Sequence, residues 1–262
     1  MDVSIIGGNG FVGTGISLAA KERDITPDII DRNTDLSTVN RTPAVLINAN
    51  GNSKKYLATQ DPELDYKLSV ESVQQSLSSF SPNLYVYLST VDVYDHLTSP
   101  EGNTEDQTID LDKVSVYGRH KLQAEALVQE QAENWLILRM AGFIGPGLWK
   151  NPIYDILTNS PLYVHPDSEF QYLHTVELGR IILDLIQRGC RNEVINVAGN
   201  GLANLHQVAD WADTRCNLQG DPQAVRYEIN IDKLLSLRDV PKTRDTLMAF
   251  VQDVREGRLP LT

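Results

Sequence analysis

Tyr117 and Lys121 lie four residues apart in a helical stretch, so their side chains share one face of the helix. An unperturbed tyrosine has a pKa of about 10 and is a poor base at neutral pH. A neighbouring ammonium group favours the phenolate and lowers that pKa, which would let Tyr117 act as an acid or base toward an alcohol or a ketone. Because this spacing also arises by chance on helix surfaces, the pair gains weight only from the segments around it.

Thr90 supplies a hydroxyl that could assist the same chemistry. It follows the apolar run 84–88, which is typical of a buried strand, and ligands of parallel sheets bind at the carboxyl ends of the strands. A Thr90 hydroxyl at such a strand end could polarise a substrate carbonyl beside Tyr117. A hydroxyl that merely caps the backbone there is the alternative.

A glycine-rich segment near the start of the chain could hold a dinucleotide. Gly7, Gly10 and Gly13 stand at three-residue spacing between a short β-branched run and a helical pattern. Such glycines permit a tight turn and a close approach of the backbone to a pyrophosphate, and the helix N-terminus offers free amides to that anion. Asp31 ends the next expected strand, where a carboxylate accepts hydrogen bonds from a ribose diol and favours NAD. Arg32 beside it keeps NADP open, because a guanidinium pairs with phosphate.

The elements that would position these residues alternate between strands and helices. Short apolar runs predict strands over 3–6, 28–31, 44–47, 84–88, 135–138 and 194–197. Helical patterns follow the glycines through residue 20 and cover 63–77, 116–131 and 176–186. This alternation indicates βαβ units. The sequence therefore predicts an α/β fold, a Rossmann-like doubly wound parallel sheet with a small C-terminal substrate lobe.

The interval 31–44 is too short for the helix and strand that a doubly wound nucleotide fold normally places there. It holds Pro43, several polar residues and no clear periodicity. We expect the sheet to be trimmed on the side where adenine should lie. The adenine would then be more exposed, and a loop, a tail or a second subunit would have to cover the outer strand edge.

The character of the chain changes after Pro146, where prolines and glycines become frequent and the elements shorter. We expect residues 1–145, with sheet elements also from 175–200, to form an NAD-binding Rossmann domain. Residues 146–174 and 201–262 are expected to form a small substrate-binding lobe, with one strand near 225–229. The acidic loop 95–112 is either a mobile flap beside the site or a merely solvated surface loop.

The overall charge limits the kinds of partner. The 35 acidic against 23 basic residues give a formal net charge of -12, which disfavours nucleic acid and anionic membranes because both need a basic surface. No apolar run is long enough to span a bilayer. Cys190 and Cys216 lack the Cys/His spacing of a metal site, so each is expected to be a structural thiol. We expect a small-molecule partner, no metal and a cytoplasmic location, and the sequence leaves a homodimer open.

The chain resembles the extended short-chain dehydrogenases/reductases, the NAD-dependent epimerase/dehydratase family, which act mostly on nucleotide sugars. The resemblance rests on motifs in the expected order, Gly7-x-x-Gly10-x-x-Gly13, Ser89-Thr90-x-x-Val93-Tyr94, Tyr117-x-x-x-Lys121 and Arg139-x-x-x-x-x-Gly145-Pro146-Gly147. It continues through 170–178 and 195–199 and so covers nearly the whole chain.

The resemblance implies catalytic roles for Tyr117 as acid/base, Lys121 as its partner and Thr90 as the assisting hydroxyl. It also implies that 48–50 and 140–143 line the cofactor. Together with the glycine segment, the candidate cofactor-binding residues are Gly7, Gly10, Phe11, Val12, Gly13, Asp31, Arg32, Asn48, Ala49, Asn50, Ser89, Tyr117, Lys121 and Gly142.

Two positions depart from the family pattern. Dehydratases of the family carry an acidic pair directly after the threonine, whereas Val91 and Asp92 stand there in this chain, so the first acid is missing. The asparagine usual in the helix before the threonine strand corresponds to Ser69, which would weaken a structural-water and proton-relay role.

The leading interpretation is an NAD(P)-dependent epimerase or oxidoreductase that acts on a sugar hydroxyl or keto carbon, with a nucleotide sugar as substrate. An epimerase cycle needs no acid or base beyond Tyr117, which suits the presence of Val91. The alternatives are a ketoreductase or dehydratase on a non-nucleotide substrate, and a non-catalytic dinucleotide-sensing protein. Such sensors tend to lose the tyrosine or lysine that this chain keeps.

Overall fold

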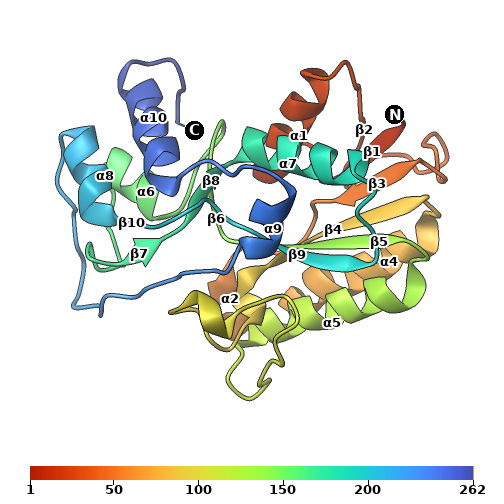
Figure 1. The fold of residues 1–262 in the computed structure, drawn as a ribbon, viewed down its shortest axis with the longest axis horizontal. Coiled ribbons are helices and arrows are strands. Elements are labelled where there is room, and N and C mark those ends of the chain that lie inside the picture. The colour runs from red at the N-terminus through yellow and green to blue at the C-terminus, as the bar shows by residue number, and fades with distance from the viewer. Residues whose placement is uncertain (262) are drawn as a thin grey trace.

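A sheet of six parallel strands forms the centre of the molecule (Figure 1). The structure is a computed structural model and describes residues 1–261. The strand order is β2-β1-β3-β4-β5-β9, with the bounds β1 Val3–Ile6, β2 Asp28–Ile30, β3 Val45–Asn48, β4 Leu84–Thr90, β5 Trp135–Met140 and β9 Glu193–Val197. Every neighbouring pair is parallel. The apolar runs of these strands are buried under helices on both faces, which confirms the predicted doubly wound α/β sheet.

Two helix layers cover the sheet (Figure 1). Helices α1 (Phe11–Lys21) and α7 (Thr175–Gln187) lie on one face, and α4 (Ser72–Ser79) and α5 (Val116–Gln131) lie on the other. α1 and α7 pack so closely that a Cβ atom built on Gly179 would lie 2.8 Å from the Cα atom of Ile16. This contact fixes the position of α1 and of the glycine segment that precedes it.

The predicted helix 63–77 is interrupted by a π-helical turn. It consists of α3 (Pro62–Tyr66), a π-helical turn over Lys67–Glu71 and then α4, and a short helix α2 (Lys55–Gln60) precedes it. Such turns insert one residue into a helix and are frequent at functional sites. This one packs against α5, the helix that carries Tyr117 and Lys121.

The interval between β2 and β3 contains turns and bends but, over the described residues 31–44, no helix or strand. β2 is therefore the outermost strand of the sheet, as the length of the interval predicts. Leu36 and Val39 from this interval pack against a buried cluster that includes Ile30 and Phe80. A loop thus covers part of the apolar surface that a further strand and helix would otherwise bury.

A second hydrophobic cluster lies beside the sheet (Figure 1). Its elements are α6 (Pro152–Leu157), α8 (Leu205–Ala212), α10 (Thr243–Arg255) and two small sheets, which pair β6 (Gly142–Ile144) with β8 (Tyr172–His174) and β7 (Glu169–Phe170) with β10 (Ala203–Asn204). In contrast, α9 (Asp232–Leu237) packs Leu234 into the core of the main sheet. The chain thus leaves the sheet after β5, builds part of this cluster, and returns to the sheet through α7 and β9. It then completes the cluster with β10, α8 and α10.

The prediction of a strand near 225–229 is wrong. This segment is extended but forms only an isolated bridge between Arg226 and Glu169. The side chain of Gln171 takes the place of a neighbouring strand, because its nitrogen donates to the Ile229 carbonyl at 3.3 Å and its oxygen accepts the Ile229 amide at 2.6 Å. A side chain satisfies these backbone groups without a regular ladder.

The acidic loop 95–112 is anchored to the core through a buried asparagine. The Asn103 amide group donates to the Ser99 and Glu228 carbonyls at 2.9 and 2.8 Å, and the Asn103 carbonyl accepts from Asn196 at 2.9 Å. None of the residues of this fully described loop belongs to the wall of the large cavity at the carboxyl ends of the strands. Of the two interpretations of the loop, the anchoring through Asn103 favours a fixed surface loop over a mobile flap.

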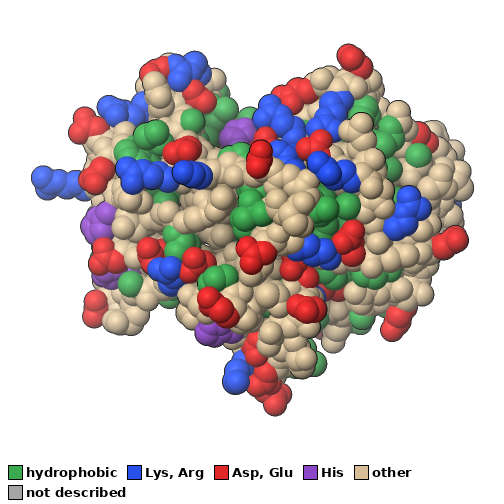
Figure 2. Space-filling view, viewed as in Figure 1, with side chains coloured by type: hydrophobic (Ala, Val, Ile, Leu, Met, Phe, Trp, Pro, Cys, Tyr) green, Lys and Arg blue, Asp and Glu red, His purple; other side chains and the backbone are tan. Residues whose placement is uncertain are grey.

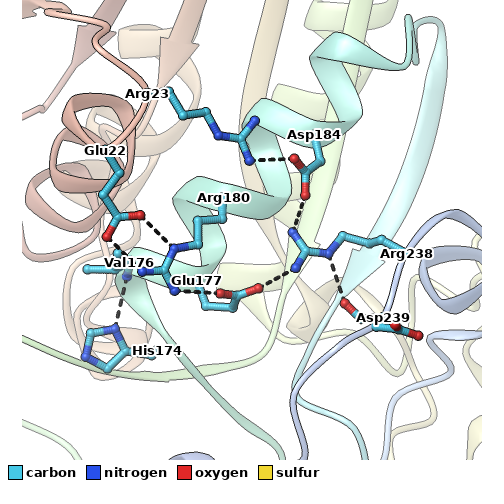
Figure 3. A network of polar contacts seen from close by, with 9 residues as sticks. All are labelled: Glu22, Arg23, His174, Val176, Glu177, Arg180, Asp184, Arg238 and Asp239. Carbon is cyan, nitrogen blue, oxygen red and sulfur yellow. Dashed lines mark hydrogen bonds and ion pairs between the residues drawn. The ribbon is translucent and has the colours of Figure 1, made fainter.

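An ionic network joins the segment before α10 to the first helix through α7 (Figure 3). Arg238 donates to Glu177 and to Asp184, the latter at 2.6 Å, and Arg180 pairs with Glu22 at 2.7 Å. The charged members are three arginines and three carboxylates, Arg23, Arg180, Arg238, Glu22, Glu177 and Asp184.

On the face shown in Figure 2, acidic and basic side chains are interspersed and no single basic patch forms. This face is hollowed between α10 and the pair α1–α7, where a cavity of about 410 Å³ is lined by residues that include His174, Arg180 and Phe250. No helix within 1–261 is long and apolar enough to cross a membrane. The same residues contain no group of three or more His, Cys, Asp or Glu side chains suited to a metal ion.

Candidate functional site

One large cavity lies along the carboxyl ends of the strands and extends to the second hydrophobic cluster. Its volume is about 1070 Å³. Residues at the ends of β1 to β5 contribute to its wall, which is where ligands bind in open parallel sheets. Of the predicted site residues, those in the wall are Gly7, Gly10, Phe11, Val12, Asp31, Arg32, Ala49, Asn50, Ser89, Thr90, Tyr117 and Gly142. Gly13, Asn48 and Lys121 are not part of this wall and lie behind it.

The glycine segment forms a cradle at one side of this cavity. Gly7 has a φ of +76°, and a Cβ atom on Gly13 would lie 2.2 Å from the Gly7 carbonyl oxygen, so the turn excludes larger residues. α1 begins at Phe11 with no side-chain cap and no acidic residue in its first turn. Its first backbone hydrogen bond runs from the Thr14 amide to the Gly10 carbonyl at 2.8 Å. The Gly10 amide donates to the Gly7 carbonyl at 3.0 Å, whereas the amides of the first turn of α1 offer donors to an anion. The residues present fit a dinucleotide pyrophosphate.

Asp31 and Arg32 lie directly after β2 in the same wall. The Asp31 carboxylate accepts a hydrogen bond from the Asn9 side chain, and the Asp31 amide donates to the Thr34 hydroxyl at 2.8 Å. A ribose held by Asp31 would place its base next to the interval 31–44. The greater exposure of an adenine at this trimmed edge stays a prediction.

Lys121 is buried behind the wall, on the helix that carries Tyr117. Its Nζ atom donates to the Tyr87 hydroxyl at 3.1 Å and to the Leu88 carbonyl at 3.2 Å, both on β4. Burial lowers the pKa of Lys121 to about 8, although two carboxylates act in the opposite direction. The lysine is therefore close to the point at which it exchanges its proton near neutral pH.

The pKa of Tyr117 is raised rather than lowered, which corrects the expectation from the sequence. Burial is the main cause, followed by the carboxylates of Asp92 and Asp65, whereas a hydrogen bond with Thr90 acts in the opposite direction. The Lys121 ammonium donates to β4 and does not offset these effects. Tyr117 therefore holds its proton at neutral pH in this structure, as an acid does.

Thr90 serves the turn after β4 and also borders Tyr117. Its hydroxyl donates to the Asp92 carboxylate at 2.9 Å and accepts the Asp92 amide at 3.2 Å, so it caps the 3-10 turn Val91–Val93. Lys55 pairs with the same carboxylate at 2.6 Å. Thr90 also forms a hydrogen bond with Tyr117. The Thr90 hydroxyl therefore caps the backbone at the end of β4 and also belongs to the site.

Buried polar contacts hold the wall from behind. Ser89 donates to Glu125, which also accepts from Nε and Nη2 of Arg139 at 3.2 and 2.7 Å. Asn48 donates to the Tyr85 hydroxyl at 2.8 Å. The side chain of Asn48 is thus engaged inside the protein, and its place is behind the site rather than against a ligand.

The cavity wall also contains the aromatic Trp149 and the cationic Lys150, which no pattern in the sequence indicated. Trp149 and Lys150 precede α6, and Nζ of Lys150 donates to the Ser53 carbonyl at 2.8 Å. Nζ of Lys54 and Nζ of Lys150 lie 5.6 and 5.1 Å from the centroid of the Trp149 ring. Burial and the neighbouring Lys54 lower the pKa of Lys150. The only signal was two short Lys-containing stretches in polar loops, which equally describes ordinary surface.

Asn151 fixes the loop that carries Trp149 and Lys150. Its φ of 125° lies in a region that residues other than glycine rarely adopt. Its Nδ2 donates to the Phe143 carbonyl at 2.9 Å, and its Oδ1 accepts the Tyr154 amide at 2.9 Å. Residues held in such conformations cluster at ligand sites, and Asn151 is part of the cavity wall.

Comparisons with known proteins bear on the family and the fold. A family model described as RmlD substrate binding domain matches residues 1–229. A comparison with curated proteins found no match.

Solved structures with a similar fold include enzymes of sugar-nucleotide metabolism. A dTDP-4-dehydrorhamnose reductase from Clostridium acetobutylicum is 18% identical with a TM-score of 0.77, over 97% of this chain and 100% of that chain. A UDP-glucuronic acid 4-epimerase from Bacillus cereus, in complex with UDP-glucuronic acid and NAD, is 16% identical with a TM-score of 0.78, over 98% and 100%. A UDP-glucose 4-epimerase from Thermus thermophilus, in complex with NAD, is 17% identical with a TM-score of 0.76, over 97% and 99%. At these identities the likeness shows the fold. Because the family model spans most of the chain, this protein belongs to the RmlD substrate binding domain family.

Proposed function

We propose that this protein is an NAD-dependent enzyme that oxidises or reduces a carbon of a nucleotide sugar. The observation that carries the proposal is a single cavity whose wall contains both the glycine segment at the start of α1 and Tyr117. One of the solved structures with a similar fold contains NAD together with UDP-glucuronic acid. A cavity of about 1070 Å³ is large for one small ligand and suits a cofactor and a substrate side by side.

The residues in the cavity wall indicate which side chains and amides would hold NAD. The free amides at the N-terminus of α1 would bind the pyrophosphate, and Asp31 would bind the adenosine ribose, which favours NAD over NADP. Ser89, which precedes Thr90 on β4, and Gly142, which borders Tyr172, line the same wall. When bound, NAD supplies a group that accepts or returns a hydride.

Tyr117 is the group that we propose to hold and move the proton of the substrate hydroxyl. Its raised pKa would keep the proton on the phenol until negative charge develops on the substrate oxygen, which would then take the proton. Thr90, which borders Tyr117, would form a hydrogen bond with the substrate oxygen that exchanges its proton with Tyr117. Lys121 would supply a buried positive charge that favours the phenolate when the proton leaves.

The second hydrophobic cluster would supply the substrate lobe. Lys150 and Trp149 from this side, with Lys54 opposite, place two cationic groups around one aromatic ring at the cavity. The chain as a whole carries a net charge of -12, and against this background the local positive charge suits the phosphates of a nucleotide sugar. Tyr172 and Tyr227 add aromatic surface for a base or a sugar ring.

The geometry favours an epimerase or a reductase over a dehydratase. Val91 is buried and apolar at the position of the first dehydratase acid. Asp92 is paired with Lys55 and accepts from Thr90. A free acidic pair after Thr90, which water expulsion would use, is therefore missing from this fully described turn.

The test starts from the mass of any nucleotide that co-purifies with the protein. A panel of UDP- and dTDP-sugars is then assayed for protection against heat and for turnover with NAD(H) and NADP(H). Retained cofactor with an epimeric product supports an epimerase, and cofactor exchange in every turnover supports a reductase. Binding of NAD(H) with neither protection nor turnover by any sugar would contradict the proposal and favour a dinucleotide sensor.

A further inference from the structure

One buried carboxylate near the site has no permanently charged partner. Asp65 on α3 is fully buried. Its Oδ1 accepts from Nδ2 of Asn52 at 2.7 Å and from the Ser69 hydroxyl at 3.3 Å, and its Oδ2 lies 2.7 Å from Nδ1 of His120. Withdrawing a carboxylate from water is costly, and two of these three partners are neutral at any pH. A structural contact alone would be satisfied by an amide at this position.

The partners of Asp65 belong to the two segments that enclose Lys121. His120 precedes Lys121 on α5, and the Tyr66 ring packs edge-on against the imidazole at 5.4 Å between centroids. Asn52 belongs to the loop after β3, where Gly51 lines the cavity and a Cβ atom on Gly51 would lie 3.4 Å from Nζ of Lys121. The Asp65 carboxylate thus ties the loop that passes over Lys121 to the helix that carries it.

Two carboxylates, those of Glu125 and Asp65, raise the pKa of Lys121. They differ in how much of their negative charge is balanced by a neighbouring cation. Glu125, on α5, accepts from both Nε and Nη2 of Arg139, so most of its charge is matched. Asp65, from α3, is matched only when His120 carries a proton. Asp65 is therefore the less compensated negative charge that favours the protonated form of Lys121.

The other titratable groups that face Lys121 are neutral tyrosines. Tyr87 on β4 accepts from Nζ, and burial raises its pKa well above the ordinary value. The pKa of Tyr117 on α5 is raised by burial, and the carboxylates of Asp92 and Asp65 add to the effect. The charge of Asp65 consequently acts on both members of the Tyr117–Lys121 pair.

We propose that Asp65 is a positioning residue for Tyr117 and Lys121, whose carboxylate places a negative charge beside the pair and, through Asn52, fixes the loop over Lys121. The consequence for turnover rests on the proposed function, whereas the charge state of Lys121 is a property of the protein alone.

The charge is tested with Asp65→Asn, which keeps the size of the side chain. A unit charge several ångströms away, at an effective dielectric constant of about 20, shifts a pKa by on the order of one unit. We expect the titration midpoint of Lys121 to fall by about one pH unit, measured by NMR on the apoprotein labelled with 13C,15N-lysine, with Lys121→Met to assign the signal. Glu71→Gln is the matched control, because it removes an exposed carboxylate from the adjacent π-helical turn. That variant should leave the midpoint unchanged.

A second pair of variants changes the charge beside the Asp65 carboxylate without altering Asp65 itself. His120→Lys places a permanent cation against the carboxylate and should also lower the Lys121 midpoint, whereas the neutral donor of His120→Gln should not lower it. This pair decides the proposal if Asp65→Asn does not fold. A Lys121 midpoint that stays at its wild-type value in either folded Asp65→Asn or His120→Lys would overturn the proposal.

The kinetic readout separates charge from tethering. Asp65→Asn should move the limb of the kcat pH profile that reports Lys121 to lower pH, since the carboxylate opposes the lowering of the Lys121 pKa by burial. Asn52→Ala keeps the charge but frees the loop, so it should lower kcat/KM without moving the profile. A lowered kcat with unmoved limbs in Asp65→Asn would reduce Asp65 to a structural residue. If no nucleotide sugar is turned over, the NMR titration still decides this proposal while the proposed function fails.

Discussion

Tyr117 is the residue on which the proposed chemistry depends most directly. Tyr117→Phe removes only the hydroxyl, so turnover should fall by about two orders of magnitude or more, as for a lost acid or base. NAD affinity and Tm should stay near those of the wild type. Tyr163→Phe is the matched control, because Tyr163 is 71% exposed and lies outside the cavity wall. Wild-type turnover in Tyr117→Phe would remove this residue from the mechanism.

Lys121 should make the free energy of unfolding depend on pH. Its pKa is about 8 in the folded protein, against an ordinary value of 10.5, so the unfolded chain binds more protons between these values. Stability therefore rises with pH across this window, by at most about 3 kcal/mol at roughly 1.4 kcal/mol per unit. Urea unfolding of wild type and Lys121→Met from pH 7 to 10.5 measures the effect. The difference should move in favour of the wild type as pH rises, and a constant difference would contradict the buried charge.

Asp31 should decide the choice of cofactor. Its carboxylate would repel a 2′-phosphate, so wild type should bind NAD(H) more tightly than NADP(H), and Asp31→Ala should shrink that gap. Arg32→Ala should weaken only NADP(H). Fluorescence titration of both cofactors gives the affinities. Tighter binding of NADP(H) by the wild type would show that Arg32 decides instead.

The identities of these residues could be predicted from the sequence, but their charge states could not. The spacing of Tyr117 and Lys121 along one helix is a local property. The direction of the Tyr117 pKa depends instead on burial and on the carboxylates of Asp92 and Asp65, the second of which comes from α3. The pair formed by Asp65 and His120 joins residues 55 positions apart, and no local pattern announces it.

At the scale of elements, prediction succeeded where periodicity or length alone decides. The helix Val116–Gln131 has the predicted bounds, and the interval 31–44 lacks a strand and helix because it has no room for them. The prediction failed at 225–229, where a hydrogen bond from Gln171, 58 residues away, replaces a strand ladder. The π-helical turn Lys67–Glu71 was missed because it depends on packing against α5 rather than on the apolar spacing.

The contact between α1 and α7 provides a prediction at this scale. Glycine to alanine inside a helix normally stabilises by about 1 kcal/mol through helix propensity. A Cβ atom on Gly179 would, however, lie 2.6 Å from the Ala19 Cβ and 2.8 Å from the Ile16 Cα. We expect Gly179→Ala to destabilise by about 1–3 kcal/mol and to weaken NAD binding, because α1 would move with the glycine segment.

Urea unfolding and NAD titration measure both effects of Gly179→Ala. Ser78→Ala at an exposed position of α4 is the control, since it gains helix propensity without new contacts and should not reduce stability. An increase in stability of Gly179→Ala would show that propensity outweighs the close packing.

At the scale of the whole molecule, the ionic network of Figure 3 connects the two ends of the chain. Arg238→Met should destabilise by about 1–2 kcal/mol, because Glu177 and Asp184 each lose one cationic partner at sites that are largely buried. Arg258→Met is the control, since the Arg258 side chain is 53% exposed in its pairs and such ion pairs contribute little. Urea unfolding at low and high salt gives both values. Equal effects of the two substitutions would show that the network has no special role.

The distribution of charge over the surface and the packing between distant segments could be predicted only in part from the sequence. The excess of acidic residues excluded a broad basic surface, and the face in Figure 2 shows none. The local cationic group of Lys54 and Lys150 was hidden by the same average, because its members are separated by 96 positions in sequence. Likewise, Leu234 is buried because α9 packs back onto the core of the main sheet, which its neighbours in sequence do not indicate.

The close contact of α1 with α7 also has a consequence for the time course of biosynthesis. α1 ends at Lys21 and α7 begins at Thr175, so at about 5–20 residues per second the ribosome completes the second helix roughly 8 to 30 s after the first. Throughout that time the apolar face of α1 lacks its partner, and β5, once it is made, lacks β9. A nascent chain at this stage carries the complete glycine segment without the helix that holds it in place. We therefore expect a dinucleotide to bind the glycine segment only after α7 has been made.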